Sequence, residues 1–342
     1  MKILLPAKRK GPVPETRGYL MKYEMLDKLL EEKRAVFENI SDRIWEFAKT
    51  RFQEKQSAGL QMETLRTEGF DIEEGIGGIE TAFCAKFGSG HPVIGILGEY
   101  DALPGMSQKA DVTEKMPEKE GAPGHGCGHH LLGTGGMEAA VAVKDYLMKN
   151  PMDGTVIYYG CPGEEGGAGK AFMVSAYSDV LQNKTLDQLV FSHIREIYPL
   201  KYTEEEMACA EKFHKVGDPG DWKTYQGLAK QFYGEKGNAF FRGAMADTIF
   251  PPVPVKMGST DVGDVSWTVP TAWFGSACYA LGTPAHSWLA VAQGKSGIAK
   301  RGMEAAASVI ARTTLDIMEN PQIAKKPGNI WKRLRTDLSI TA

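Results

Sequence analysis

The sequence predicts an α/β fold in which a mostly parallel sheet is flanked by helices. Short apolar runs bounded by glycine, at residues 81–88, 92–98 and 155–160, are predicted to be buried strands. Residues 131–149, between the last two of these runs, are predicted to be a helix. Alternation of buried strands and helices is typical of α/β proteins, in which ligands bind at the carboxyl ends of the strands.

Further elements are predicted on either side of this central segment. Residues 22–55 carry apolar side chains at helical spacing, with charged residues on the other face. Residues 271–282 are predicted to be a strand, whereas residues 217–243 show only weak periodicity. More helices are predicted at 185–198, 203–217 and 294–318.

The composition places the chain in the soluble globular class and gives no sign of a nucleic-acid or membrane partner. Of its 342 residues 42% are hydrophobic and 24% charged, and the formal net charge is −3. No apolar run approaches the roughly 20 residues that a membrane span needs. The first residues contain only a four-residue apolar stretch, so no signal peptide is predicted. Five scattered cysteines favour reduced thiols, and hence a cytoplasmic location.

The stretch GHGCGHH, residues 124–130, combines Cys127 and His129 in a glycine-rich turn before the helix predicted near Leu131. Thiolate and imidazole are strong protein ligands for zinc-like ions. The positive end of the helix is expected to lower the pKa of Cys127 and to favour its thiolate. The alternative is a glycine-rich turn in which the histidine and cysteine are incidental.

Two adjacent carboxylates, Glu164 and Glu165, follow the third predicted strand directly. Like charges at a buried strand end are unfavourable unless a cation or a proton offsets them. A metal hydrolase needs one carboxylate to bind the metal and another to take a proton from the attacking water. The alternative for this pair is a solvated turn. His286, in GTPAHSW, is predicted at a further strand end, where a lone histidine is more often structural than ligating.

Four more acids lie in loops that the fold prediction places near these motifs. GEYDALPG contributes Glu99 and Asp101, and GSTDVGDVSW contributes Asp261 and Asp264. Acids that orient ligating imidazoles are expected beside a metal site. Each acid is weak support alone, but together the motifs favour a metal site.

Five motifs, GEYDALPG, GHGCGHHLLGTGG, YYGCPGEEGGAGK, STDVGDVSW and GTPAHSW, occur in the order found in a known family. Over residues 25–325 the chain resembles the aminoacylase/carboxypeptidase metallopeptidase family, and most of all its amidohydrolase branch. The resemblance implies a three-layer, zinc-peptidase-like catalytic domain with two divalent metals, zinc or manganese. It also implies hydrolysis of the amide of an N-acyl amino acid or a dipeptide, such as p-aminobenzoyl-glutamate.

The same resemblance implies a role for each of the matching residues. Cys127 would bridge the metals, and Glu164 would be the general base. Asp101 would be the catalytic acid that supports the site. The remaining ligands would be His129, Glu165 and His286.

The chain departs from the family near residue 180. Family members carry there a second domain, a lid that also forms the dimer, and this sequence has no room for it. We therefore expect an extension at 1–24, a single catalytic domain at 25–325 and a tail at 326–342. A lid-mediated dimer is not expected. The second metal site would lack a ligand, and His193 is interpreted as a helix-surface histidine rather than its replacement.

Two functions are consistent with these features. The first is a metal-dependent amidohydrolase that acts on a small N-acyl amino acid or dipeptide. The second is a lid-less, non-catalytic remnant, or a truncated gene product, that keeps the fold and one metal. The intact motifs favour the enzyme, whereas the missing lid favours weak turnover.

Overall fold

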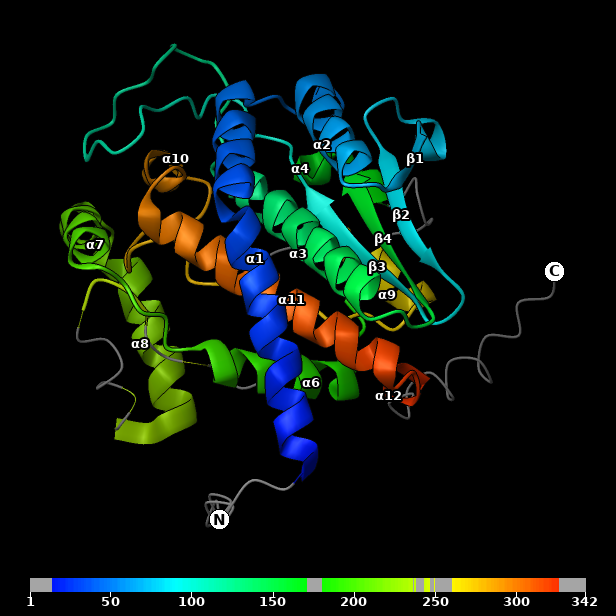
Figure 1. Cartoon of the computed structure of the whole chain (residues 1–342). Coiled ribbons are helices and arrows are strands. Elements are labelled where there is room, and N and C mark those ends of the chain that lie inside the picture. Colours follow the sequence, from blue (N-terminus) through cyan, green and yellow to red (C-terminus); the bar gives the residue numbers. More distant parts are fainter. Residues whose placement is uncertain are drawn as a thin grey trace, which may run out of the picture.

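A computed structural model describes residues 14–170, 180–235, 237, 243–246, 249 and 260–325 (Figure 1). The expected tail at 326–342 lies outside the described residues, as do the first thirteen residues of the expected extension and most of the segment around the missing lid.

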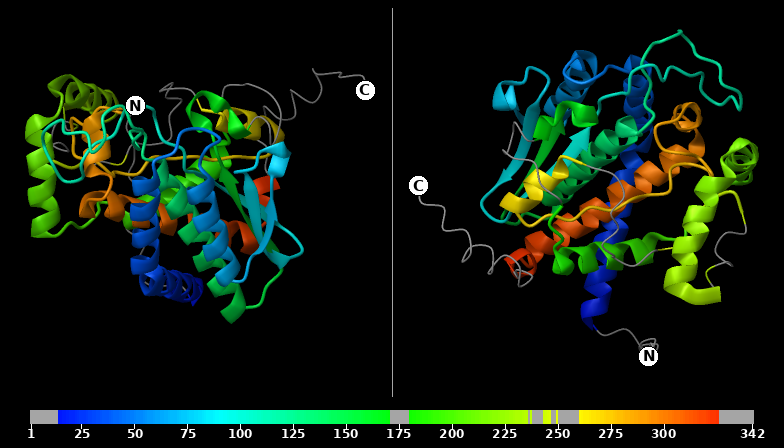
Figure 2. Two further views of the ribbon diagram at one scale, coloured as in Figure 1. Left: turned by 90° about the horizontal axis from the view of Figure 1, so that it is seen from above. Right: turned by 180° about the vertical axis from the view of Figure 1, so that it is seen from behind.

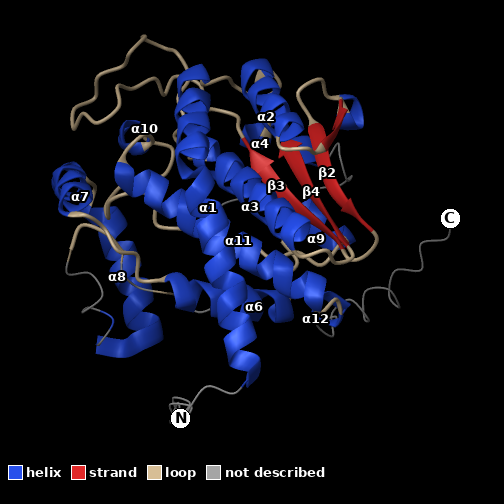
Figure 3. Ribbon diagram, in the orientation of Figure 1, coloured by secondary structure: helices blue, strands red, loops and turns tan. Residues whose placement is uncertain are grey.

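The sheet has four described strands in the order β1-β2-β4-β3 (Figure 3). Strands β3 and β4 are parallel, with Glu99 opposite Cys161, while β1 and β2 run antiparallel to their neighbours. The strands span Asp71–Glu74 (β1), Phe83–Ser89 (β2), Val93–Glu99 (β3) and Gly154–Cys161 (β4). The α/β class is therefore confirmed, with a mixed sheet whose parallel pair carries the motifs of interest.

Helices cover both faces of this sheet. One face carries the long helices, with α3 directly on β3 and β4, and with α1 and α11 packed outside α3 (Figures 1 and 2). The opposite face carries the short helix α9, Val262–Thr268. The long layer consists of α1 (Pro14–Phe47), α2 (Lys55–Thr67), α3 (His129–Lys149) and α11 (Gly297–Glu319). The layers thus place both halves of the chain around one sheet.

One apolar core joins the two halves. It includes Leu26 and Ile44 of α1, Met137 of α3 and Leu315 of α11, all buried. Fully burying one side chain of this size stabilises the fold by roughly 1.5–3 kcal/mol. Helices α1 and α3 and the last long helix therefore share one core.

The remaining helices lie beside this core and differ in how well the sequence predicts them. Helices α6 and α7 form where apolar periodicity predicts them. Helix α8 lies in the segment of weak periodicity, and the side chain of Asp218 caps its start. The bounds are Glu164–Gly167 (α4), Lys184–Ile197 (α6), Glu204–Val216 (α7), Pro219–Tyr233 (α8), Trp288–Gln293 (α10) and Gln322–Lys325 (α12), with a 3₁₀ turn at Ile76–Gly78.

The strand predicted at 271–282 is wrong, because this segment is irregular. Its backbone N–H groups donate to isolated acceptors rather than to a neighbouring strand. The N–H of Ala277 donates to Tyr198 Oη, and that of Ala280 donates to Gln293 Oε1 at 2.8 Å. His286 is consequently positioned by a loop and not by a strand end.

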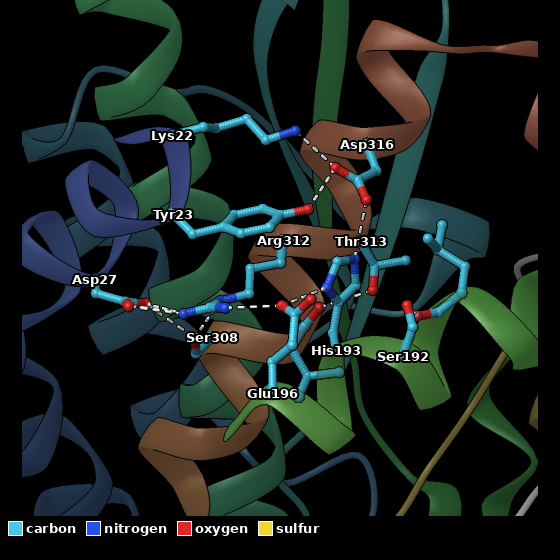
Figure 4. A network of polar contacts seen from close by, with 12 residues as sticks. Lys22, Tyr23, Asp27, Ser192, His193, Glu196, Ser308, Arg312, Thr313 and Asp316 are labelled. Carbon is cyan, nitrogen blue, oxygen red and sulfur yellow. Dashed lines mark hydrogen bonds and ion pairs between the residues drawn. The ribbon is translucent and has the colours of Figure 1, made fainter. Parts of the chain in front are cut away.

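Part of the segment expected to be an N-terminal extension is helical. Helix α1 begins at Pro14, within the segment expected to be a loose extension, and Lys22 and Tyr23 are buried against α11. Lys22 Nζ and Tyr23 Oη both donate to Asp316 Oδ1 at 2.7 Å (Figure 4). The last turns of this segment are therefore part of the packed fold.

The same polar network contains His193 (Figure 4). Its ring is fully buried, with Nε2 3.1 Å from Asp316 Oδ2 and Nδ1 3.5 Å from Glu196 Oε2. The expected surface position is thus wrong, because α6 turns this side chain inward. Arg312 bonds Glu196 and both carboxylate oxygens of Asp27, which completes the link between α1, α6 and α11.

The network depends on a charged Asp316. Burial alone would raise the pKa of Asp316, but hydrogen bonds from His193, Lys22 and Tyr23 outweigh it and lower the pKa to about 2. The unfolded value is 3.8. The stabilisation is therefore fully present above pH 4 and is lost as the pH falls toward 2.

We predict that Asp316→Asn lowers the free energy of unfolding at pH 7 by on the order of 2 kcal/mol, because Lys22 loses its buried anionic partner. Urea unfolding followed by circular dichroism at pH 7 and at pH 3 measures the effect. The variant should differ less from the parent at pH 3 than at pH 7. An equal difference at both pH values would contradict the assignment, and the exposed Asp153→Asn serves as the control.

Candidate metal centre

The predicted site residues converge at the carboxyl ends of β3 and β4. Glu99 is the last residue of β3, and Asp101 lies two residues beyond it. Glu164 and Glu165 lie in α4, shortly after the end of β4. The 124–128 loop and the 283–287 loop approach from the other side, where the N–H of His286 donates to the carbonyl of Gly126 at 3.0 Å. The parallel pair thus places the motifs together, as expected for an α/β sheet.

Helix α3 brings its first residue, His129, over the end of β3. The helix can approach because residue 133 is glycine: a Cβ there would lie 2.2 Å from the carbonyl oxygen of Glu99. Gly128, which precedes the helix, has φ +82°, a conformation that favours glycine. The glycines of the motif therefore fix the distance between an imidazole and a strand-end carboxylate.

The first group of candidate ligands is Cys127, Glu165 and His286, whose ligand atoms all lie within 4.8 Å of one another. His286 Nε2 is 3.4 Å from Glu165 Oε1. His286 has φ +54°, an uncommon left-handed conformation for a residue other than glycine. The loop thus holds a strained backbone where it presents the imidazole, as strained residues often do at functional sites.

The second group is Glu99, His129 and Glu164, which also lie within 4.8 Å of one another. His129 Nε2 is 3.2 Å from Glu99 Oε2 and 3.8 Å from Glu164 Oε2. The same nitrogen is 3.9 Å from Glu165 Oε1, so His129 stands between the two groups.

Asp101 contacts one member of each ligand group, His129 of the second and Glu165 of the first. Its Oδ1 lies 2.8 Å from His129 Nδ1, and its Oδ2 accepts a hydrogen bond from the N–H of Glu165 at 2.8 Å. A carboxylate on one imidazole nitrogen orients the other nitrogen toward a metal. Asp101 is therefore a positioning residue that aligns His129 and Glu165.

The charges of the second group depend on one another. Burial alone would lower the pKa of His129, but the charge of Glu99 and the hydrogen bond to Asp101 raise it well above its usual value. For Asp101 burial acts in the opposite direction and alone would raise the pKa. The hydrogen bond to His129 and its charge outweigh burial, so the pKa of Asp101 is lowered. Loss of solvent, and then the charge of Glu99, raise the pKa of Glu164 to about 7. Glu99, Asp101 and Glu164 thus share the positive charge of one imidazole, that of His129.

Cys127 differs from its expectation. The structure raises the pKa of its thiol, first through loss of solvent and also through the negative charge of Glu165, although His129 acts in the opposite direction. The predicted lowering of the Cys127 pKa by the helix is therefore wrong. The residue remains exposed overall and can reach a ligand from solvent.

The donor set fits a divalent metal. Glu165 Oε1 is buried and accepts no hydrogen bond from the described residues, which leaves it available to a cation. Thiolate, imidazole and carboxylate are the three ligand types that zinc uses in proteins. The structure brings Cys127, Glu165 and His286 together with His129 adjacent, as the sequence predicts, while their roles as ligands stay a prediction.

Other motif residues have different positions. His125 and His130 are buried, and their Nε2 atoms pair with the carbonyls of Ile44 and Gly294, away from both ligand groups. Asp264 is buried on α9 and belongs to neither group. Of the three histidines in this motif, only His129, the predicted ligand, belongs to a ligand group.

Two residues near the site were underrated or missed. Glu99 is part of the second ligand group, although the sequence supports it only weakly. Lys170, directly after the double-glutamate motif, pairs with Glu99 and Asp261 at 2.5 Å each. A lone lysine next to an apolar run, in GGAGKAFMV, was the available signal.

Both groups open into one cleft of about 1580 Å³. Apolar side chains from β3, α3, α9, α11 and the 269–274 segment line much of it, including Ile94, Leu132, Val265, Phe274 and Ile310. Apolar clefts with a few convergent polar groups are typical of small-molecule sites.

The α/β fold and a strand-end cluster of thiol, imidazole and carboxylates favour the class of hydrolases. Comparison with known proteins supports this class. The chain is similar to one of the subunits of p-aminobenzoyl-glutamate hydrolase from Escherichia coli (strain K12), with 28% identity over 440 residues, 86% of this chain and 92% of that protein.

It is also similar to hippurate hydrolase of Campylobacter jejuni, with 29% identity over 40% of this chain and 34% of that protein. The predicted resemblance to amidohydrolases is confirmed, and the chain is related to hydrolytic enzymes. No family model matches the chain.

Among solved structures, the YXEP protein of Bacillus subtilis, a dinuclear metal binding peptidase from the M20 family, has a TM-score of 0.49 and 12% identity, and the match covers 85% of this chain and 99% of that one. In the part of the chain that the structure describes, no helix has the length and apolar character needed to cross a membrane.

We predict that Cys127→Ser lowers the content of bound zinc in the purified protein at least tenfold, because the variant removes a soft ligand that the hydroxyl does not replace. Mass spectrometry of the metal content measures this loss. Cys84→Ser, on β2 and outside both ligand groups, should keep the parental content. Unchanged zinc in the Cys127 variant would contradict its role as a ligand.

Proposed function

We propose that this chain is a metal-dependent amidohydrolase that cleaves the amide of a small N-acyl amino acid or dipeptide, such as p-aminobenzoyl-glutamate. The main support is the convergence of Cys127, Glu165 and His286 with the group of Glu99, His129 and Glu164 in one cleft. The similarity to the Escherichia coli p-aminobenzoyl-glutamate hydrolase over 86% of the chain is independent support for this substrate class.

The proposed metal ligands are Cys127, His129, Glu165 and His286. A divalent ion there, zinc or manganese, would supply a Lewis acid that polarises the amide carbonyl and activates water. Asp101 holds the side chain of His129 and the backbone of Glu165, so it fixes the direction of two ligands. The resemblance to the family implies a second divalent metal, for which fewer ligands are available.

Glu164 is the proposed general base. It lies beside the ligand Glu165 and lines the cleft. Its pKa of about 7 favours proton transfer near neutral pH. Glu164 would take a proton from the attacking water and pass it to the leaving amine.

The proposed organisation is one catalytic domain at 25–325 without the family lid. The alignment with the Escherichia coli relative spans 440 positions, of which this chain fills only about 294. About 146 positions of that protein therefore have no counterpart here. A lid contributes remote contacts that hold the substrate and lower the barrier at the reacting centre. We infer a high KM, a low kcat and a cytoplasmic enzyme.

An amidase assay on the purified, metal-loaded chain tests this function. We expect release of glutamate from p-aminobenzoyl-glutamate, or of glycine from hippurate, at a low rate that a chelator abolishes. Absence of turnover in a folded protein that binds metal would instead support the alternative of a non-catalytic remnant.

We predict that Glu164→Gln reduces kcat about 10²–10⁴-fold while the bound metal remains, because the amide cannot accept a proton. Glu165→Gln should lose both the metal and the activity. Steady-state kinetics and metal analysis on the same preparations separate the two roles. Parental activity in Glu164→Gln, or parental metal in Glu165→Gln, would refute the respective assignment.

We also propose that the chain is a monomer, because the family dimer forms through the lid. Sedimentation equilibrium at micromolar concentration should give the mass of one chain, 37.4 kDa. A stable dimer that maps to residues 181–250 would contradict this expectation.

A further inference from the structure

Lys170 is anchored at both ends by one carboxylate. Its backbone N–H donates to Asp261 Oδ2 at 2.8 Å, and its Nζ donates to Asp261 Oδ1 at 2.5 Å. The preceding Gly169 passes so close to the carbonyl of Pro162 that a Cβ would lie 1.8 Å from that oxygen. The path of the chain therefore directs this lysine inward from the loop after β4.

The ammonium of Lys170 lies between two carboxylates and away from solvent. The residue is only 1% exposed, and Nζ also donates to Glu99 Oε1 at 2.5 Å. Burial lowers the pKa of Lys170, but the charges of Glu99 and Asp261 outweigh this and raise the pKa above its usual value. The side chain is thus a permanent positive charge beside the second ligand group.

Glu99 connects this ammonium to the candidate metal ligands. One carboxylate oxygen bonds Lys170, and the other lies 3.2 Å from His129 Nε2. A divalent ion bound by Glu99 and Glu164 would therefore lie one carboxylate away from the ammonium. Repulsion between like charges is strong in a buried site, and pulling Glu99 away would leave the ammonium with fewer partners.

Among the described residues, the first ligand group has no buried lysine beside it. Among the described residues, no lysine or arginine forms an ion pair with the Glu165 carboxylate. Arg51 donates instead to the backbone carbonyl of Glu165 at 3.1 Å, and His129 Nε2 lies 3.9 Å from Glu165 Oε1. A divalent ion bound by Cys127, Glu165 and His286 could use Glu165 Oε1, which accepts no hydrogen bond from the described residues.

We infer that the Lys170 ammonium takes the place of a second metal ion beside Glu99, so that the centre holds one divalent metal and not two. This inference rests on the proposed metal-dependent function and deepens it. The metal would bind at Cys127, Glu165 and His286 with His129, and Lys170 would neutralise Glu99 and Asp261 permanently. The lysine is a positioning residue in this arrangement, since it acts through Glu99.

Metal stoichiometry of the full chain tests the inference. The protein is stripped with a chelator, dialysed against micromolar Mn²⁺, and its metal content is measured by mass spectrometry. One Mn²⁺ per chain is the expected result. Two tightly held ions would overturn this inference and leave the proposed function intact, whereas no bound ion, with zinc also absent, would overturn both.

A variant then shows whether the ammonium is the cause. Lys170→Met removes the charge and should raise the affinity for a second Mn²⁺ at least tenfold, so that the stoichiometry approaches two. Lys170→Arg keeps the charge and should stay at one, as should Lys55→Met, whose lysine is exposed and pairs with Glu80. A folded Lys170→Met that still binds one ion would overturn the inference. If that variant does not fold, two ions in Lys170→Arg or in the parent would do so.

Discussion

The close packing of α3 between the sheet and α11 is the constraint on which the site depends. Gly133 lets α3 lie against the Glu99 carbonyl, and Gly135 faces the backbone of Met303 on α11, where a Cβ would be 3.2 Å from the carbonyl oxygen. A side chain at Gly133 would displace the helix, and one at Gly135 would tighten its contact with α11. His129, at the first turn, would then move relative to Glu99 and Asp101. The glycines of the motif thus have two roles: Gly128 allows the turn before α3, and Gly133 and Gly135 allow α3 to pack closely against its neighbours.

The site contains more acidic than basic side chains, and His129 and Lys170 each contact more than one acid. Within the described residues, two histidines and one lysine contact five clustered acids. The basic residues are His129, His286 and Lys170, and the acids are Glu99, Asp101, Glu164, Glu165 and Asp261. The pKa of Glu164 rises because loss of solvent and the charge of Glu99 outweigh the opposite effect of His129. The polar network of α1, α6 and α11 is built differently, because every charge in it has an opposite partner. The site carboxylates outnumber their basic partners, which favours binding of a further cation. The network of α1, α6 and α11 has balanced charges and stabilises the fold.

The sequence predicts the central strands, the long helices and the principal ligand candidates, because local patterns determine these features. Alternation and glycine boundaries mark β2, β3 and β4, and the motifs end on the strands that become neighbours. The predicted strand at 271–282 fails because a strand also needs a partner edge, which local pattern does not reveal.

His193 illustrates the same limit for a single residue. Its helix is predictable, but the face that α11 covers depends on tertiary packing. The role of Lys170 requires knowledge that Asp261, 91 positions further along the chain, folds back onto it. The assignments that depend on pairing between distant segments are therefore the ones that sequence alone could not supply.

The ion pair between Lys22 and Asp316 has a consequence for the order of folding during synthesis. The two residues are 294 positions apart, so at about 5–20 residues per second the first is made roughly 15–60 s before the second. Helix α1 also packs on α3, which allows the early part of the chain to collapse around the sheet before α11 exists. Until α11 is made, the apolar side chains that it covers in the folded protein lack this cover. Contacts of such long sequence separation slow the final step of folding.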